Sequence, residues 1–203
     1  MKFYDSIGPN PKLVRVFAAE KGLTLDSIKV DLRGGENRQP TYLAKNPFGQ
    51  VPCLELDDGT VISETTAICE YLDEVGSGVS LIGSDAAERA QTRMWVRRID
   101  LNIITPIGYG YRFGEGLKMF ESRVHCIPQA AGDFKEIAQE WLTRLDAMIA
   151  DRTFVVGERM TLADIFLYVN LDFFSRFGQP MNPNNQHILA LVERMKMRPS
   201  AAA

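Results

Sequence analysis

The chain has 203 residues, of which 45% are hydrophobic and 24% are charged, a balance typical of a globular protein with a substantial buried core. Its formal net charge is −3 and no basic run occurs, so we expect no nucleic-acid partner. No apolar stretch is long enough to span a membrane, and Asp5 and Pro9 interrupt the segment in which a secretory signal would be apolar. We therefore expect a cytoplasmic protein without a membrane partner.

The cysteines and histidines predict neither a disulfide nor a metal site. There are three cysteines, Cys53, Cys69 and Cys126, with no Cys-x-x-Cys pair among them. The two histidines, His125 and His187, are isolated from each other and from further ligands. This composition favours a reducing compartment, and we expect no bound metal.

The first third of the chain mixes short strands with helices. Residues 2–6 form a candidate strand, and residues 27–31 alternate polar and apolar side chains as a second strand would. Between them, residues 11–21 suit a helix, with Asn10 as its N-cap and Gly22 as its stop.

A hairpin and a helix should complete this region. Residues 53–56 and 61–63 are candidate strands, joined by a turn that contains Asp58-Gly59. A helix is expected over residues 65–74. The order β-α-β followed by ββ-α is that of a thioredoxin-like domain, in which the first two strands are parallel.

The rest of the chain is predicted to be helical. Residues 76–84 suit a linker, and Asp85 to Glu88 has the spacing of a capping box. Thr161 to Asp164 has similar chemistry at a helix start. Apolar residues three and four apart predict one buried helix face: Phe134, Ile137, Ala138, Trp141, Leu142, Leu145, Met148 and Ile149. We therefore expect an α/β thioredoxin-like domain over residues 1–78 and an all-α domain over residues 85–203.

Two spaced motifs carry the functional information. Residues 46–54 read Asn-Pro-Phe-Gly-Gln-Val-Pro-Cys-Leu, and residues 63–68 read Ser-Glu-Thr-Thr-Ala-Ile. The pair resembles the glutathione site of the cytosolic glutathione transferase family, whose pattern is N-P-x-G-x-V-P followed by E-S-x-A-I. The resemblance implies glutathione as co-substrate, a thioredoxin-like fold with a helical domain, and a homodimer.

The resemblance also assigns glutathione-binding residues. Pro52 is expected to be cis, with the backbone of Val51 pairing with the cysteinyl part of glutathione. Glu64 would pair with the γ-glutamyl ammonium, and Thr65 would receive its carboxylate at a helix start. Without a ligand role, Glu64 would be an acid favoured by the helix dipole.

The glycyl end of glutathione has its own expected partners. Gln50 and Arg38 match positions that hold this end in related classes, and a guanidinium suits a carboxylate well. Asn37 falls where some classes have a histidine. The alternative for Arg38 is a solvated residue in a loop.

The residue that contacts the sulfur stays open among Asn10, Ser6 and Tyr4. A free thiol titrates near about 8.5, and the thiolate is the nucleophile, so an enzyme must favour the charged form. In this family a Tyr, Ser or Cys of the first loop does so. Asn10 could act by capping the first helix while facing the sulfur, whereas Tyr4 could instead point into the core.

The second substrate should lie against the helical domain. Tyr109, Arg112 and Phe113, with Tyr111 beside them, stand among glycines near the end of a long helix, which suits an adaptable apolar pocket for an electrophile. The alternative is that these rings only fill the helical core.

We therefore expect a glutathione transferase that acts in detoxification by activating the glutathione thiolate for attack on a hydrophobic electrophile. Two alternatives keep the fold. In the first, the same site supports a glutathione-dependent lyase, dehalogenase, isomerase or reductase. In the second, the chain is a non-catalytic binding module.

Overall fold

The computed structural model describes residues 1–203 and divides into two compact units. The first comprises Met1–Ile82 together with Pro199–Ala203, and the second comprises Gly83–Arg198. The expected helical domain ran to residue 203, whereas the contacts place its last five residues with the first unit. No helix is long and apolar enough to cross a lipid bilayer.

The first unit is built on a four-stranded sheet with the order β2-β1-β3-β4. Its strands are β1 (Lys2–Asp5), β2 (Asp26–Lys29), β3 (Cys53–Glu55) and β4 (Val61–Ser63). β1 pairs with β2 in parallel, and the other two pairs are antiparallel. The mixed sheet confirms the expected thioredoxin-like class, and the predicted hairpin and parallel pair are both present.

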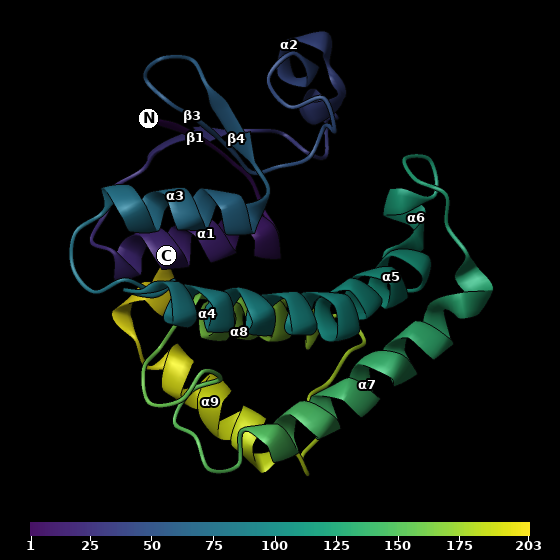
Figure 1. Ribbon diagram of the computed structural model, residues 1–203. Coiled ribbons are helices and arrows are strands. Elements are labelled where there is room, and N and C mark those ends of the chain that lie inside the picture. Colours follow the sequence, from purple (N-terminus) through teal and green to yellow (C-terminus); the bar gives the residue numbers. More distant parts are fainter. The chain divides into compact units, whose positions relative to one another are not determined.

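Helices accompany this sheet. α1 (Pro9–Glu20) and α3 (Thr65–Val75) lie side by side along it (Figure 1). η1 (Glu36–Arg38) and α2 (Pro40–Leu43) follow β2, and η4 (Pro199–Ala202) packs against α1, where Ser200 donates a hydrogen bond to Glu20. The buried faces of α1 and α3 carry apolar residues at helical spacing: Leu13, Val14, Phe17, Ile68 and Leu72.

The second unit is entirely helical, as expected. In chain order it contains α4 (Ala86–Ile99), η2 (Asp100–Ile104), α5 (Thr105–Phe113), α6 (Leu117–Phe120), η3 (Pro128–Ala130), α7 (Ala131–Met148), α8 (Leu162–Phe174) and α9 (Gln186–Lys196). α8 is the central helix, because it contacts both α4 and α9 and is buried continuously from Leu162 to Leu171.

Two details of the helical unit differ from the sequence predictions. On α7, Ile137 and Met148 are exposed, although the spacing of apolar residues placed them on a buried face. At α4, Asp85 accepts a hydrogen bond from the Glu88 amide, but the Glu88 carboxylate turns to Ser84 rather than to the cap residue. Half of that predicted capping box is therefore present.

The predicted box at Thr161 is complete and buried. The Asp164 carboxylate accepts hydrogen bonds from the amides of Thr161 at 2.8 Å and Val155 at 2.7 Å. The Thr161 hydroxyl accepts one from the Ala163 amide. The first turn of the central helix is thus joined to the segment before it, without access to water that could replace these bonds.

Replacing Asp164 by Ala should lower the free energy of unfolding by about 2–4 kcal/mol, because two buried amides lose their acceptor. The matched variant Asp85→Ala removes a solvent-exposed cap and should cost about 1 kcal/mol or less. Urea unfolding followed by circular dichroism measures both. Equal losses would contradict the structural role given to the buried carboxylate.

Candidate functional site

The register of the strands brings three segments to one end of the sheet. Cys53, the first residue of β3, pairs with Ser63, the last of β4, and with Tyr4 near the end of β1. The residues just before β3, just after β4 and just after β1 therefore share one edge. They are Val51-Pro52, Glu64-Thr65 and the loop that leads into α1.

Val51 presents a free backbone to this edge. The Val51-Pro52 peptide bond is cis, as the resemblance implied. Val51 lies before β3, and its amide and carbonyl make no hydrogen bond within the chain. Since a little-exposed peptide group needs a partner, this segment is suited to receiving a peptide-like ligand or water.

The preceding loop is held by two buried asparagines. Asn46 donates to the Gln50 carbonyl at 2.8 Å, and that carbonyl also accepts from the Tyr42 hydroxyl at 2.7 Å. Asn37 donates to the Gly49 carbonyl at 2.5 Å. These bonds use the carbonyls of residues 49 and 50, so the loop stays fixed while Val51 remains free.

This arrangement changes the interpretation of Asn37. Its amide nitrogen, the group that could bind a carboxylate, is already committed to Gly49, and the side chain is buried. Arg38 and the Gln50 side chain are exposed, and a β-carbon added at Gly49 would lie 3.5 Å from the Arg38 side chain. Of the three residues predicted for the glycyl end, Arg38 and Gln50 are the accessible ones, whereas Asn37 positions the loop.

Glu64 stands in an unusual backbone conformation. Its φ is 69°, and it is the only residue other than glycine with positive φ. This conformation is costly for a side chain with a β-carbon. Glu64 occupies the N-cap position of α3, yet its carboxylate makes no capping hydrogen bond and has no ion-pair partner. Helix capping therefore does not explain this acid, which stays available to a ligand.

Thr65 is the first residue of α3. Its hydroxyl has no partner within the chain, and the helix start leaves the first backbone amides unpaired. A carboxylate next to these amides would be stabilised by hydrogen bonds and by the helix dipole. The pair Glu64-Thr65 thus offers one group for a cation and one for an anion.

The loop into α1 differs from the prediction at Asn10. The helix begins at Pro9, two residues early, and Gly8 with φ of 118° takes the N-cap position. Asn10 is therefore not the cap; it is exposed in the first turn between Pro9 and Pro11. Since proline has no amide hydrogen, Asn10 supplies the only backbone N–H of the first three helical residues.

The other two sulfur candidates are engaged elsewhere. Ser6 donates its hydroxyl proton to the Val30 carbonyl at 2.7 Å. The Tyr4 hydroxyl donates a hydrogen bond to the Glu55 carboxylate at 2.7 Å, and this carboxylate also accepts one from the Lys45 ammonium at 2.6 Å. Both residues are buried. Asn10 is the one candidate whose side chain has no partner within the chain.

In the helical unit, the predicted pocket residues form part of an aromatic cluster. The Phe113 ring stacks with Tyr109 at 5.4 Å and contacts Phe134 at 5.9 Å, and Phe113 is only 6% exposed. Tyr109 is 37% exposed, with the Arg112 guanidinium over its ring. Phe113 thus packs the helices, as the alternative interpretation held, while Tyr109 and Arg112 reach the surface.

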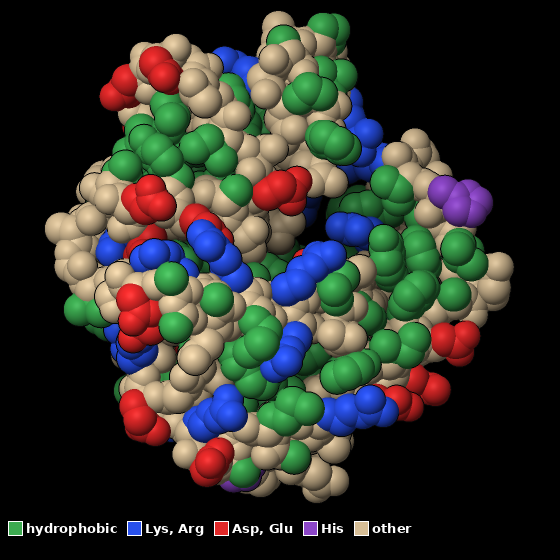
Figure 2. Space-filling view, viewed as in Figure 1, with side chains coloured by type: hydrophobic (Ala, Val, Ile, Leu, Met, Phe, Trp, Pro, Cys, Tyr) green, Lys and Arg blue, Asp and Glu red, His purple; other side chains and the backbone are tan.

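Tyr111 belongs to a second cluster, made of rings from α6, α8 and the segment after α8. It therefore also packs the helices. Figure 2 shows hydrophobic side chains gathered over α5, α6 and the adjoining part of α7. The exposed large hydrophobic residues of these three helices include Tyr109, Met119 and Ile137. This surface suits contact with an apolar molecule.

The sequence does not show the structural roles of Tyr42, Asn37 and Asn46 in this loop. Asn46 was part of the recognised motif, but nothing in the sequence shows that its amide holds the Gln50 carbonyl. An asparagine just before Pro47 is a common turn residue, and this is the only local signal. Tyr42 has no local sequence signal, because its role depends on a reversal of the chain that brings the Gln50 carbonyl to its hydroxyl.

Comparison with known proteins gives a consistent result. The family described as "Glutathione S-transferase, N-terminal domain" matches residues 8–75, and "Glutathione S-transferase, C-terminal domain" matches residues 128–203. Glutathione S-transferase 2 of Saccharomyces cerevisiae is 30% identical over 98% of this chain and 87% of its own length. The chain belongs to the glutathione S-transferase family.

Two further similar proteins have names that describe other activities. Maleylacetoacetate isomerase of Pseudomonas aeruginosa is 33% identical over 81% of this chain and 76% of its own length. Human elongation factor 1-gamma is 38% identical over 81% of this chain, which spans 37% of that protein. The crystal structure of a glutathione S-transferase domain-containing protein from Marinobacter aquaeolei superposes with a TM-score of 0.89 at 38% identity, covering 98% of this chain and 99% of the other.

The contact between Tyr4 and Glu55 makes a prediction about pH. Hydrogen bonds from Lys45 and then Tyr4 lower the pKa of Glu55 from 4.5 to about 2. Between these values the unfolded chain binds more protons than the folded one, so the free energy of unfolding should fall as the pH decreases from 4.5 toward 2. Tyr4→Phe should raise the pKa of Glu55 and weaken this dependence, as measured by urea unfolding at several pH values. An unchanged slope would contradict the assignment.

Proposed function

We propose that this chain binds glutathione at the edge formed by Val51-Pro52, Glu64-Thr65 and the loop into α1, and transfers it to a hydrophobic electrophile. The observation that carries the proposal is the set of unpaired groups at one end of the sheet: the free backbone of Val51, the uncapped carboxylate of Glu64 and the open start of α3. Glutathione offers complementary groups, since it has a peptide backbone, an ammonium and carboxylates.

In this proposal each group has one task. The Val51 peptide groups pair with the cysteinyl residue, Glu64 holds the ammonium, and the Thr65 hydroxyl and amide hold the adjacent carboxylate. Arg38 and Gln50 are left to bind the glycyl carboxylate, with Asn37 keeping the loop in place. The thiol sulfur then lies toward the loop into α1.

The chemistry required of that loop is electrostatic. An amide side chain cannot remove a proton at neutral pH, so Asn10 would act as a hydrogen-bond donor that favours the thiolate. Its own backbone amide is a second donor. The thiolate sulfur would attack the electrophilic carbon, while the thiol proton is released to solvent.

The electrophile would lie against the exposed Tyr109 and the half-buried Arg112 of α5, with Phe113 supporting the Tyr109 ring from within. Two further features stay predictions, namely a cytoplasmic role in detoxification and a homodimer. Phe48, 79% exposed at the tip of the loop before Val51, supports the homodimer, because an exposed ring of this size is often covered by a partner.

Two alternatives remain open. The relation to an isomerase supports a different reaction of the same bound glutathione. The relation to elongation factor 1-gamma supports a binding module without catalysis. The first keeps glutathione binding and a lowered thiol pKa, whereas the second predicts the loss of one or both.

Glu64→Gln should weaken glutathione binding by about ten- to a hundredfold, because the charged hydrogen bond to the ammonium is lost. Glu74→Gln, at the other end of the same helix, is the matched control and should leave affinity unchanged. Glu64→Gly should also weaken binding, while raising the free energy of unfolding by up to about 1 kcal/mol through release of the positive φ. Isothermal titration calorimetry and urea unfolding give both quantities. Full affinity in Glu64→Gln would exclude the proposed role.

Asn10→Ala should raise the pKa of bound glutathione by about one unit, because one donor to the thiolate is lost. Ser6→Ala and Tyr4→Phe should leave that pKa unchanged, because their hydroxyls are already bonded to protein acceptors. Ultraviolet absorbance of the thiolate across pH measures all three. A shift in either control with none in Asn10→Ala would reverse the assignment.

A further inference from the structure

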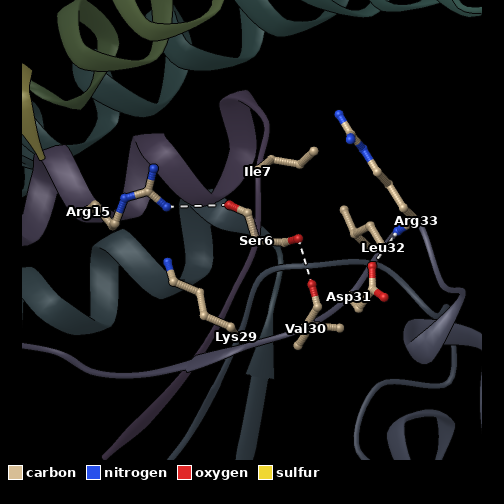
Figure 3. Close-up of a pocket in the computed structure, with 8 residues that line it drawn as sticks. All are labelled: Ser6, Ile7, Arg15, Lys29, Val30, Asp31, Leu32 and Arg33. Carbon is tan, nitrogen blue, oxygen red and sulfur yellow. Dashed lines mark hydrogen bonds between the residues drawn. The ribbon is translucent and has the colours of Figure 1, made fainter.

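A cavity of about 480 Å³ opens in the first unit, beside the loop into α1 (Figure 3). It is lined by residues 6–7, Arg15 and residues 29–33. Ser6 and Ile7 immediately precede Gly8 and the start of α1, so this cavity adjoins the place to which the proposed function assigns the glutathione sulfur.

Two of the cations at the cavity are anchored by one buried acid. Asp5 is fully buried, and its two carboxylate oxygens pair separately with Arg15 and Lys29. Arg15 also reaches the Ser6 carbonyl at 3.5 Å. One carboxylate therefore opposes two cations, and this group carries a surplus positive charge.

The third cation, Arg33, is unpaired. Its backbone amide donates to the Asp31 carboxylate at 3.0 Å, and the Gly34 amide donates to the same oxygen at 2.9 Å. The guanidinium itself has no hydrogen-bond or ion-pair partner. Figure 3 shows the Arg33 side chain extending away from Asp31, toward the side on which Ile7 lies. The Asp31 carboxylate thus holds the turn of the backbone and forms no ion pair with the guanidinium.

The same cavity has an apolar side. Ile7 is 63% exposed, and the half-buried Leu32 also lines the cavity (Figure 3). Keeping a large aliphatic side chain in water brings no benefit to folding, so Ile7 suits contact with a ligand. The apolar part of a molecule bound here would contact the aliphatic side chains of the protein, and one end of that molecule would meet the free guanidinium.

We propose that the electrophile taken by this protein carries a carboxylate that binds Arg33, and that the apolar part of the molecule next to this carboxylate lies against Ile7 and Leu32. The inference rests on the proposed function and names the substrate class for it. A planar guanidinium pairs with a carboxylate through two parallel hydrogen bonds, and the surplus charge of Arg15 and Lys29 adds to the attraction.

The test compares one electrophile with its uncharged ester. In 4-chloro-3,5-dinitrobenzoate the thiolate sulfur bonds to the carbon that carries chlorine, chloride leaves with the bonding pair, and the thiol proton goes to solvent. The methyl ester reacts in the same way without the carboxylate. The ratio of kcat/KM for acid and ester, compared between variants, cancels the difference in intrinsic reactivity.

Arg33→Gln should lower that ratio about tenfold, with kcat/KM for the ester retained. Arg144→Gln, an exposed arginine on α7, is the control and should leave the ratio unchanged. An unchanged ratio in Arg33→Gln would overturn the inference. So would a weaker affinity for glutathione itself in Arg33→Gln, since Arg33 would then belong to the glutathione site.

Calorimetric titration separates this inference from the proposed function. If the natural chain does not bind glutathione, the proposed function fails. The cavity is then tested by titrating the unreactive 3,5-dinitrobenzoate and its methyl ester. Acid binding that is at least about tenfold weaker in Arg33→Gln would support the anion site, and equal binding in both proteins would overturn it.

Discussion

The candidate site depends on a peptide segment that makes no hydrogen bonds within its own protein. Val51 lies one residue before Pro52 and two before β3. The carbonyls of residues 49 and 50 are engaged by Asn37, Asn46 and Tyr42, and Cys53 is paired in the sheet. A chain that leaves one little-exposed peptide unit unpaired among paired ones accepts a cost that only water or a ligand can offset. The fixed loop and the free segment are therefore two parts of one arrangement.

The charged groups of the first unit show the same contrast between paired groups and one unpaired group. Asp5, Glu55 and Asp31 are satisfied by cations or backbone amides. Glu64 lies at the end of the sheet that forms the candidate site, and its carboxylate has no protein partner. It is also the only non-glycine residue with a positive φ. Backbone strain and a carboxylate without a protein partner at one residue indicate a function, because the positive φ costs about 1 kcal/mol or more, while the helix dipole stabilises an exposed acid by only about 0.3–1 kcal/mol.

Much of this fold could be predicted from the sequence, because its signals are local. The Asp58-Gly59 turn, the alternation of β2 and the Thr161 box each act over a few residues, and each is present in the structure. The start of α1 was wrong because Pro9 and Pro11 both suit a first helical turn, and the φ of Gly8 that decides between them leaves no trace in the sequence. The exposure of Ile137 was missed because helical spacing gives a face without showing what covers it.

The backbone of the site could be predicted where a motif determines its conformation. The hydrogen-bond partners of its side chains could not. The cis bond at Pro52 followed from the motif. The hydrogen bonds from Tyr4 to Glu55 and from Ser6 to Val30 did not, because these partners lie 51 and 24 residues away along the chain. Asn37 is the clearest case, since one amide suits a ligand or a loop carbonyl equally well in sequence.

The return of η4 to α1 has a consequence for biosynthesis. The segment Pro199–Ala202 contacts α1, and Ser200 bonds to Glu20, 180 residues earlier. A ribosome releases the strands and helices of the first unit long before this segment, so α1 emerges with part of its surface uncovered. The first unit thus gains its last packing contact only after the whole helical unit has been synthesised.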